Sequence, residues 1–182
     1  MKVLIIDMNA KENSLFSKEF ISPITDILDE EVCVWQISSY KELPSVNLAK
    51  FEKIILSGNQ VMDKGPSEEE RKKYFSWLLT AKNDILGICA GAQVLAQVHG
   101  ADLYEQAEFG LLHIQVLEED KLIKKELKEI YSVHSKAFTI PKGWTCLAKT
   151  SCPQVVRKEN HYAILFHPEV RNKELIRSFL KL

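Results

Sequence analysis

The residues best suited to chemistry lie at a turn that contains Cys89. A buried aliphatic run from Asp84 to Ile88 leads into Gly87-Ile88-Cys89-Ala90-Gly91, and an amphipathic stretch from Gly91 to Val98 follows at once. This order predicts a nucleophile elbow, in which flanking glycines let a strand and a helix approach closely around a strained nucleophile. The positive end of the helix dipole would favour a thiolate. The same pattern also fits a cysteine buried only for packing.

A histidine and a carboxylate follow a second apolar run near the end of the chain. The stretch Ala163 to Phe166 reads as a strand, and His167-Pro168-Glu169 comes directly after it. A cysteine hydrolase needs a base that exchanges protons with the thiol and the leaving group, and a carboxylate that holds the imidazole in one tautomer. Alone, this turn fits a structural role better. Together with the Cys89 turn it indicates a catalytic triad of cysteine, histidine and glutamate.

The remaining cysteines and histidines lack the spacing of a metal site. The four cysteines form no C-x-x-C pair and no zinc-finger pattern with the histidines, so no metal is expected. Cys33 and Cys146 fall in strand-like stretches and are expected in the core. Cys152 precedes Pro153 in a predicted turn and offers no evident chemistry. Structural or surface roles are expected for His99, His113 and His161.

Composition and charge fit an ordinary globular chain. The 182 residues suit one core, and we expect a single domain over residues 1–182. A formal net charge of -1 argues against a nucleic-acid binder that relies on a broad basic face. The apolar run after Met1 is too short for a signal peptide or a membrane span. We therefore expect a cytoplasmic protein with reduced thiols and no membrane partner.

Two patterns along the chain predict the architecture. In the first half, short apolar runs alternate with helical stretches, which implies a mostly parallel central sheet with helices on both faces. In the second half, strand-like runs joined by tight turns, among them Lys158-Glu159-Asn160, predict antiparallel hairpins. The predicted strands are Val3 to Ile6, Val32 to Ile37, Lys53 to Leu56, Asp84 to Ile88, Leu111 to Leu117, Ile130 to Val133, Thr145 to Ala148, Val155 to Arg157 and Ala163 to Phe166. The predicted helices are Ser14 to Leu28 with a distortion near Pro23, a helix that starts at Ser67, Gly91 to Val98, and Asn172 to Leu182.

Both motifs resemble those of the class I, or triad, glutamine amidotransferases. The stretch Leu86 to Gln93 is similar to the family's nucleophile motif, Gly-(Ile/Val)-Cys-x-Gly-x-Gln, and Phe166-His167-Pro168-Glu169 is similar to its base motif. Weaker matches lie at Ile54 to Gly58, Ala107 to Gly110 and Tyr131 to Ser135. The resemblance covers most of the chain. It implies a three-layer α/β fold of flavodoxin-like type, with antiparallel hairpins in the C-terminal half.

The resemblance also implies the chemistry of each site residue. Cys89 would attack the side-chain amide of glutamine, His167 would shuttle protons, and Glu169 would orient His167. Ammonia leaves, and water then releases glutamate from the thioester. The oxyanion hole is assigned to Gly58 and Ala90. The substrate-binding residues are assigned as Gln93, Ser57 and His134. No cofactor or metal is expected in this chain.

Chain length and late hairpins most resemble the free-standing glutaminase subunit of GMP synthetase, found as a separate chain in archaea. The implied partner is a separate ATP-dependent synthetase subunit, with ATP and magnesium bound there, which would make GMP from XMP. Departures from the family pattern occur at Asn59, Ala90, Ala92 and Lys136. Lys136 follows Ser135 where the GMP synthetase subunit usually has Gly-Asp, which weakens the assignment to GMP synthesis.

Two other functions remain open from the sequence. One is a related cysteine hydrolase that acts on a γ-glutamyl compound, or a ThiJ/PfpI-like protein, although that group does not usually end in His-Pro-Glu. The other is a catalytically idle regulatory or scaffolding subunit of the same fold. The intact Cys89, His167 and Glu169 argue against an idle subunit, whereas Asn59 in the loop after the third strand keeps it open.

Overall fold

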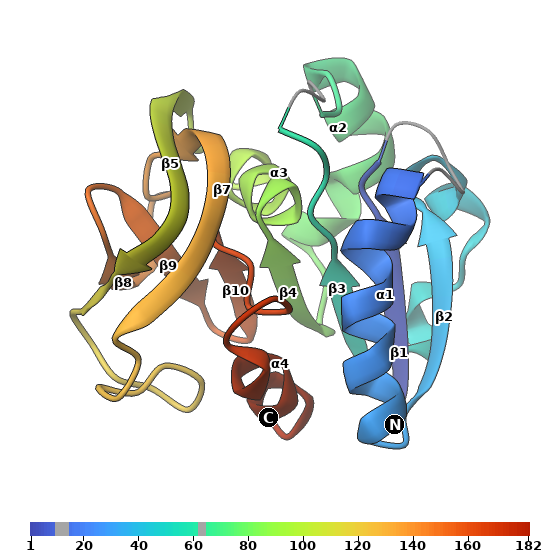
Figure 1. Cartoon of the computed structure of the whole chain (residues 1–182). Coiled ribbons are helices and arrows are strands. Elements are labelled where there is room, and N and C mark those ends of the chain that lie inside the picture. Colours follow the sequence, from blue (N-terminus) through green and yellow to red (C-terminus); the bar gives the residue numbers. More distant parts are fainter. Residues whose placement is uncertain (10–14, 62–64) are drawn as a thin grey trace.

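The central element is an eight-stranded, mixed β-sheet, seen in the computed structural model, which describes residues 1–9, 15–61 and 65–182 (Figure 1). Five strands run parallel in the order β2-β1-β3-β4-β10, and β9, β8 and β6 continue the sheet in antiparallel pairing. This parallel order is that of the flavodoxin-like folds, as predicted. The strands are β1 (Lys2–Asp7), β2 (Val34–Ser39), β3 (Lys53–Leu56), β4 (Asp84–Ile88), β6 (Gln115–Val116), β8 (Thr145–Lys149), β9 (Pro153–Lys158) and β10 (His161–Ile164).

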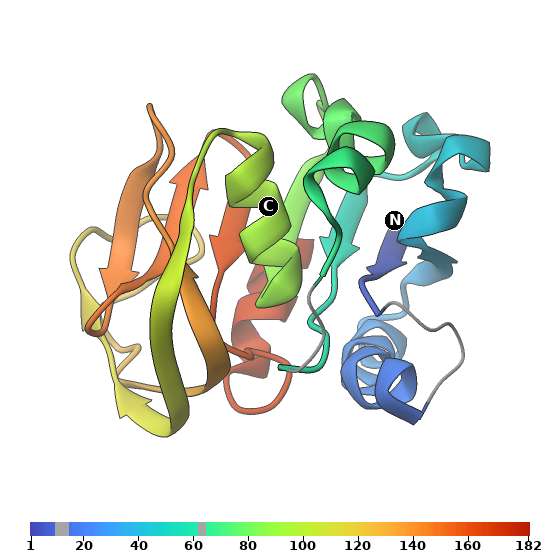
Figure 2. The ribbon, with the colours of Figure 1, turned by 90° about the horizontal axis from the view of Figure 1, so that it is seen from above.

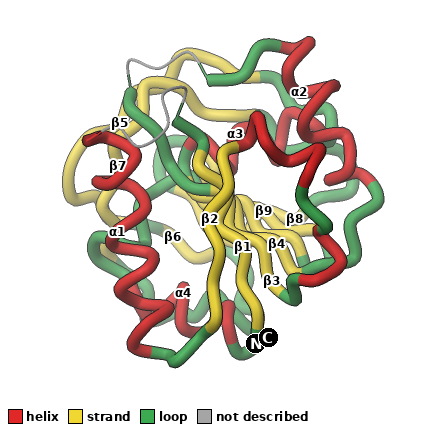
Figure 3. Tube along the Cα trace, turned by 90° about the vertical axis from the view of Figure 1, so that its right-hand side faces the viewer, coloured by secondary structure: helices red, strands yellow, loops and turns green. Residues whose placement is uncertain are grey.

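Helices cover both faces of the sheet (Figure 3). One face carries α1 (Leu15–Glu30) and α4 (Lys173–Leu180); the other carries α2 (Glu68–Phe75), α3 (Ala90–Val98) and the short 3-10 segments η1 (Tyr40–Ser45), η2 (Leu48–Lys50) and η3 (Ser76–Leu79). Successive residues of a strand point to opposite faces. In β1, Val3 and Ile5 therefore join the core under α1 and α4, whereas Leu4 and Ile6 join the core under α2 and α3. The continuous apolar run of β1 thus reflects burial on both faces.

A separate two-stranded antiparallel ribbon stands beside the main sheet. It pairs β5 (Leu103–His113) with β7 (Glu129–Phe138), and β7 passes next to α3 (Figure 2). The prediction of a strand from Leu111 to Leu117 is wrong in its bounds, because β5 begins at Leu103 and β6 is a different strand. A register shift between Glu105 and Glu108 interrupts the alternation of inward and outward side chains. This irregularity, together with the acidic residues, hid the first half of β5 from pattern analysis.

Most of the other predicted elements are confirmed, but the strand predicted from Val32 begins only at Val34, because Val32 has a positive φ of 55° in the turn before β2 and Cys33 also precedes the strand. β3 and β4 have the predicted bounds, and Glu159 takes a positive φ of 54° in the predicted turn between β9 and β10. β10 ends at Ile164 and so lies two residues earlier than predicted. The helix α1 continues through Pro23, while Ser14 lies outside the described residues. Among the described residues, no helix is both long enough and apolar enough to cross a membrane.

The start of α2 is held by a reciprocal capping box. Ser67 Oγ accepts a hydrogen bond from the Glu70 N–H at 3.2 Å, and Glu70 Oε2 accepts one from the Ser67 N–H at 2.9 Å. Two N–H groups that no helical carbonyl could reach are satisfied in this way. The predicted helix start at Ser67 is confirmed.

We expect Ser67→Ala to lower the free energy of unfolding by about 1 kcal/mol, because the Glu70 N–H loses its acceptor. Urea unfolding followed by circular dichroism measures this loss. Ser178→Ala, inside α4, is the matched control and should change the stability much less, because alanine favours a helix interior. An equal loss in both variants would contradict the capping role.

Candidate active site

Three neighbouring parallel strands deliver the predicted site residues to one edge of the sheet. β4 lies between β3 and β10, with Leu56 opposite Gly87 and Ile88 opposite Ile164. The carboxyl ends of parallel strands meet at the same edge. The chains leaving β3, β4 and β10 therefore bring Gly58, Cys89 and His167 to this edge, where Gly58 lies against the His167 ring.

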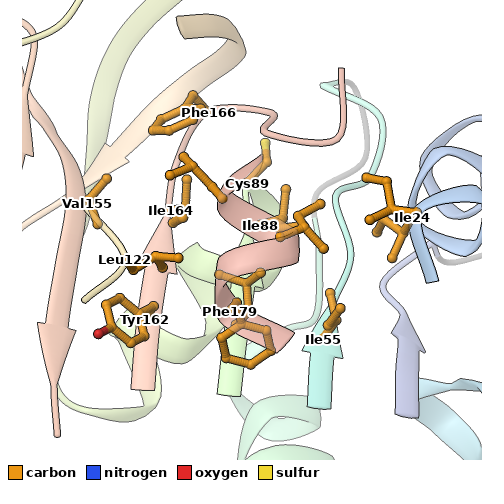
Figure 4. Packing of buried hydrophobic residues seen from close by; sticks show 14 of the residues in the cluster. Ile24, Ile55, Ile88, Cys89, Leu122, Val155, Tyr162, Ile164, Phe166 and Phe179 are labelled. Carbon is orange, nitrogen blue, oxygen red and sulfur yellow. The ribbon is translucent and has the colours of Figure 1, made fainter. Parts of the chain in front are cut away.

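Cys89 occupies a strained turn between β4 and α3. Its φ of 47° and ψ of -104° are uncommon for a residue with a side chain, and conformations of this kind cost of order 1–3 kcal/mol. Its N–H donates to the Ile164 carbonyl at 2.9 Å, and its carbonyl accepts from the Gln93 N–H at 2.9 Å. The sulfur lies 3.7 Å from the Val133 carbonyl oxygen. Cys89 sits at the end of the hydrophobic cluster that contains Ile88 and Phe166 (Figure 4). The predicted elbow is present.

The two glycines that flank Cys89 are required by close contact between strands and helix. A Cβ on Gly91 would overlap the Leu56 carbonyl oxygen, and a Cβ on Gly87 would lie 2.7 Å from the Gly91 carbonyl oxygen. Both approaches are closer than van der Waals contact permits. The Gly91 N–H donates to the Ser57 carbonyl at 3.1 Å and ties α3 to the loop after β3. The glycines thus allow the close approach expected from the sequence.

His167 and Glu169 form a buried pair beside Cys89. The His167 Nδ1 and the Glu169 Oε1 are 2.7 Å apart, and both side chains are almost fully buried. The His167 N–H donates to the Tyr131 carbonyl of β7 at 2.9 Å. Burial opposes a charged imidazole, but the Cys89 sulfur beside the ring and the Glu169 carboxylate outweigh it and hold the pKa of His167 well above its ordinary value of 6.5. The raised pKa favours a charged imidazolium beside the Cys89 sulfur.

The loop after β3 packs directly against the imidazole. A Cβ on Gly58 would lie 2.9 Å from His167 Cε1 and 2.9 Å from Phe20 Cδ1, so only glycine fits. The Phe20 ring of α1 lies 5.7 Å from the His167 ring, centroid to centroid. Sequence analysis missed Phe20, because its place on the apolar face of a helix looks like that of any core residue. The contact orients the imidazole from the side opposite to β7.

The predicted oxyanion donors lie at the start of α3 and in the loop after β3, and their role stays a prediction. Ala90 is the first residue of α3, where N–H groups have no partner within the helix, and Gly58 lies across from it near His167. Ser57 is fully buried, and its hydroxyl accepts from the Met8 N–H at 3.1 Å and donates to the Gly58 carbonyl at 2.9 Å. Asn59 does not have a positive φ, so this loop does not require glycine at position 59. Ser57 therefore shapes the loop, and its contact with substrate stays a prediction.

Gln93 and His134 both interact with the ribbon. Gln93 Nε2 donates to the Lys136 carbonyl of β7 at 2.8 Å, which ties α3 to the ribbon. His134 is buried, with Nδ1 at 3.0 Å from the Gln106 carbonyl and Nε2 at 3.5 Å from Glu108 Oε2. Both ring nitrogens of His134 thus face residues of β5. These contacts leave neither ring nitrogen directed at Cys89. The predicted contact of His134 with substrate is untested and stays a prediction.

Comparison with known proteins establishes the family of the chain. The family model described as glutamine amidotransferase class-I matches residues 23–182. The chain therefore belongs to the class-I glutamine amidotransferase family.

The similar proteins within this family include several GMP synthases and their glutamine-hydrolysing subunits. The chain is 30% identical over 174 residues to the glutamine-hydrolysing GMP synthase subunit of Methanocaldococcus jannaschii, an alignment that covers 91% of this chain and 85% of that protein. It is 34% identical over 111 residues to the corresponding subunit of Pyrococcus abyssi, covering 54% and 59%. The glutamine-hydrolysing GMP synthase of Brachyspira hyodysenteriae is 28% identical over 98% of this chain, which spans only 35% of that longer protein.

Solved structures share the fold. A candidate GMP synthase subunit of Thermoplasma acidophilum superimposes with a TM-score of 0.82 at 22% identity, covering 100% of this chain and 92% of that one. A glutamine amidotransferase of Thermotoga maritima superimposes with a TM-score of 0.71 at 20% identity, covering 99% and 80%. At these identities the likeness establishes the flavodoxin-like amidotransferase fold alone.

We expect Gly91→Ala to destabilise the protein by at least about 1–3 kcal/mol, because the new methyl group would overlap the Leu56 carbonyl. Thermal or urea unfolding measures the change. Gly143→Ala is the control, because its Cβ would meet no atom within 4 Å and only its φ of 79° is strained, at about 1–2 kcal/mol. A Gly91→Ala protein with unchanged stability would refute the close approach of α3 to β3.

We expect Cys89 to react with iodoacetamide at neutral pH faster than an ordinary thiol, because the raised pKa of His167 keeps a positive charge beside the sulfur. That charge is present below the raised pKa and is lost as the pH rises through it. Glu169→Gln removes a cause of the raised pKa, so the loss should move to lower pH and the reaction should slow at neutral pH.

Mass spectrometry of the alkylated peptide over a pH series gives these rates. Glu174→Gln, which changes an exposed carboxylate on α4, is the control and should follow the unchanged protein. Identical pH profiles for Glu169→Gln and the unchanged protein would show that Glu169 does not set the charge of His167.

Proposed function

We propose that the chain is a glutamine amidohydrolase that uses Cys89, His167 and Glu169 and delivers ammonia to a separate synthetase. The observation that supports this most strongly is the buried His167–Glu169 pair beside a cysteine in a strained strand-to-helix turn. Strain, burial and a tuned charge on one imidazole are costly for stability. Their coincidence in a class-I amidotransferase chain favours catalysis over packing as the reason for them.

The first half-reaction forms a thioester. The Cys89 thiolate attacks the δ-carbonyl carbon of glutamine, and the carbonyl oxygen becomes an oxyanion that the N–H groups of Ala90 and Gly58 would stabilise. As the carbon–nitrogen bond breaks, the His167 imidazolium donates its proton to the leaving nitrogen, and ammonia departs. The products of this step are ammonia, a γ-glutamyl thioester on Cys89 and a neutral His167.

The second half-reaction restores the enzyme. Neutral His167 takes a proton from water, the resulting hydroxide attacks the thioester carbonyl, and the carbon–sulfur bond breaks to leave the Cys89 thiolate. The new γ-carboxylic acid loses its proton to solvent and departs as glutamate. Glu169 remains ionised throughout and stabilises the imidazolium through the hydrogen bond to Nδ1. No metal or cofactor takes part in either step.

The proposed partner is a separate ATP-dependent synthetase, and the relatives' names favour GMP synthetase. The protein from Methanocaldococcus jannaschii is named as a glutamine-hydrolysing subunit of GMP synthase, and it is matched over most of its length. ATP and magnesium would bind to the synthetase. Lys136, which departs from the family pattern, is exposed on β7 and lies 3.4 Å from Glu105 of β5. The pair presents a charged edge of the ribbon next to Gln93, where a partner surface would have to match it.

Glutamate release tests the proposal. The purified chain should release glutamate from glutamine, alone or together with GMP synthetase, XMP, ATP and magnesium, and Cys89→Ala should abolish the release. Cys146→Ser, which alters a half-buried cysteine outside the site, is the matched control and should remain active. Release that persists in Cys89→Ala would refute Cys89 as the nucleophile.

The same assay separates the competing functions. Activation by the synthetase together with GMP formation supports the proposed partner. Hydrolysis of other γ-glutamyl amides without hydrolysis of glutamine would favour a related γ-glutamyl hydrolase. No hydrolysis of either substrate under any condition would favour the idle regulatory subunit.

A further inference from the structure

A second cluster of side chains that could do chemistry lies between the ribbon and the turn that joins β8 to β9. Glu108 comes from β5, His134 from β7 and Cys152 from the turn between β8 and β9. One carboxylate oxygen, one ring nitrogen and the sulfur all lie within 4.8 Å of one another. His134 and Cys152 are each 2% exposed. Three segments far apart in the sequence thus bring together an oxygen, a nitrogen and a sulfur ligand.

The hydrogen bond of His134 determines where its lone pair points. Nδ1 lies 3.0 Å from the Gln106 carbonyl oxygen, which can only accept, so Nδ1 carries the hydrogen. In the neutral ring, Nε2 then presents a lone pair. Nε2 is buried without a hydrogen-bond partner among the described residues and lies 3.5 Å from Glu108 Oε2. A metal ion can lie between two electron-rich atoms that face each other at this distance.

The surroundings of the other two residues suit metal ligands as well. Gln154 Nε2 lies 3.2 Å from the Cys152 sulfur and 2.7 Å from Glu108 Oε2, so one amide can donate to both. Thr150 Oγ1 lies 2.8 Å from both Glu108 oxygens and fixes the orientation of the carboxylate. Ligating carboxylates and imidazoles are commonly held by outer hydrogen bonds of this kind. The cluster is therefore pre-oriented by Gln106, Thr150 and Gln154.

We propose that Glu108, His134 and Cys152 bind a zinc ion. Zinc is bound by carboxylate, imidazole and thiolate at about 2.0–2.3 Å in tetrahedral geometry, and it has a strong affinity for a thiolate with an imidazole. A carboxylate and a thiolate cancel its two positive charges, which a buried site requires. The Cys152 thiol gives up its proton to solvent when the zinc–sulfur bond forms. Water completes the fourth position.

The zinc ion would stabilise the part of β7 that lies beside Cys89. His134 directly follows Val133, whose carbonyl oxygen is 3.7 Å from the Cys89 sulfur. Zinc would tie β7 to β5 and to the turn that carries Cys152. It would hold β5 and β7 in register across the irregularity between Glu105 and Glu108. The function is structural and separate from the chemistry proposed for the triad.

Zinc binding is tested in a Cys89→Ala background, so that the triad cannot supply a thiolate. The protein is stripped with a chelator, incubated with one equivalent of zinc, passed through a desalting column and analysed for metal. One zinc per chain should remain, and the melting temperature should rise. Cobalt in place of zinc should give a thiolate-to-cobalt charge-transfer band.

Added to that background, Cys152→Ser and Glu108→Gln should each lower zinc affinity by about tenfold or more, and Cys152→Ser should remove the cobalt band. Cys146→Ser is the matched control and should retain zinc, since its sulfur faces the Ala148 carbonyl at 3.5 Å, outside the cluster. If the Cys89→Ala protein neither retains zinc nor shows the cobalt band, the proposal is wrong, whatever the further variants show. Equal zinc binding by Cys152→Ser would also overturn it. Neither result depends on glutamine hydrolysis.

Discussion

The arrangement of the site depends on how closely α3 approaches β3 and β4. Gly91 has no room for a side chain against Leu56, and Gly87 has none against the backbone of Gly91. This contact places the start of α3 directly behind Cys89 and forces the chain through a positive φ at that residue. The strain is offset by buried apolar surface on both sides of the sheet and by two backbone hydrogen bonds, one that Cys89 donates to β10 and one that it accepts from α3. A looser joint between helix and sheet would release the strain and lose the orientation of the sulfur.

The electrostatic character of the site follows from the burial of His167 and from the two side chains beside its ring, Cys89 and Glu169. An imidazole as deeply buried as that of His167 would ordinarily be neutral. The Cys89 sulfur and the Glu169 carboxylate reverse this preference, and the pKa of His167 lies well above 6.5. Phe20 and Gly58 exclude alternative positions of the ring from the side of α1 and β3. The residues that bury the His167 imidazole therefore also keep the charged ring beside the Cys89 sulfur.

The ribbon of β5 and β7 supplies the remaining wall. Its backbone accepts a hydrogen bond from the His167 N–H at Tyr131, approaches the Cys89 sulfur at Val133, and accepts one from Gln93 at Lys136. Among the described residues, the ribbon belongs to neither layer of helices and pairs with no strand of the main sheet. Its position rests on these contacts, on Ile130 and Phe138, which are buried in the two hydrophobic cores, and on the buried polar cluster around Glu108. Val133, whose carbonyl oxygen lies 3.7 Å from the Cys89 sulfur, directly precedes His134 of this cluster.

The sequence by itself determined the nucleophile turn, the base turn and most of the elements that carry them. Hydrophobic periodicity and glycine spacing are local properties, so β3, β4, α3 and the start of α2 were predictable from short stretches. Only the tertiary structure decided that β4 lies between β3 and β10, which brings Gly58, Cys89 and His167 to one edge. It also decided the contact of Phe20 with His167, the extent of β5, and the meeting of Glu108, His134 and Cys152. These features depend on pairings between distant segments, and no local pattern records which segments will meet.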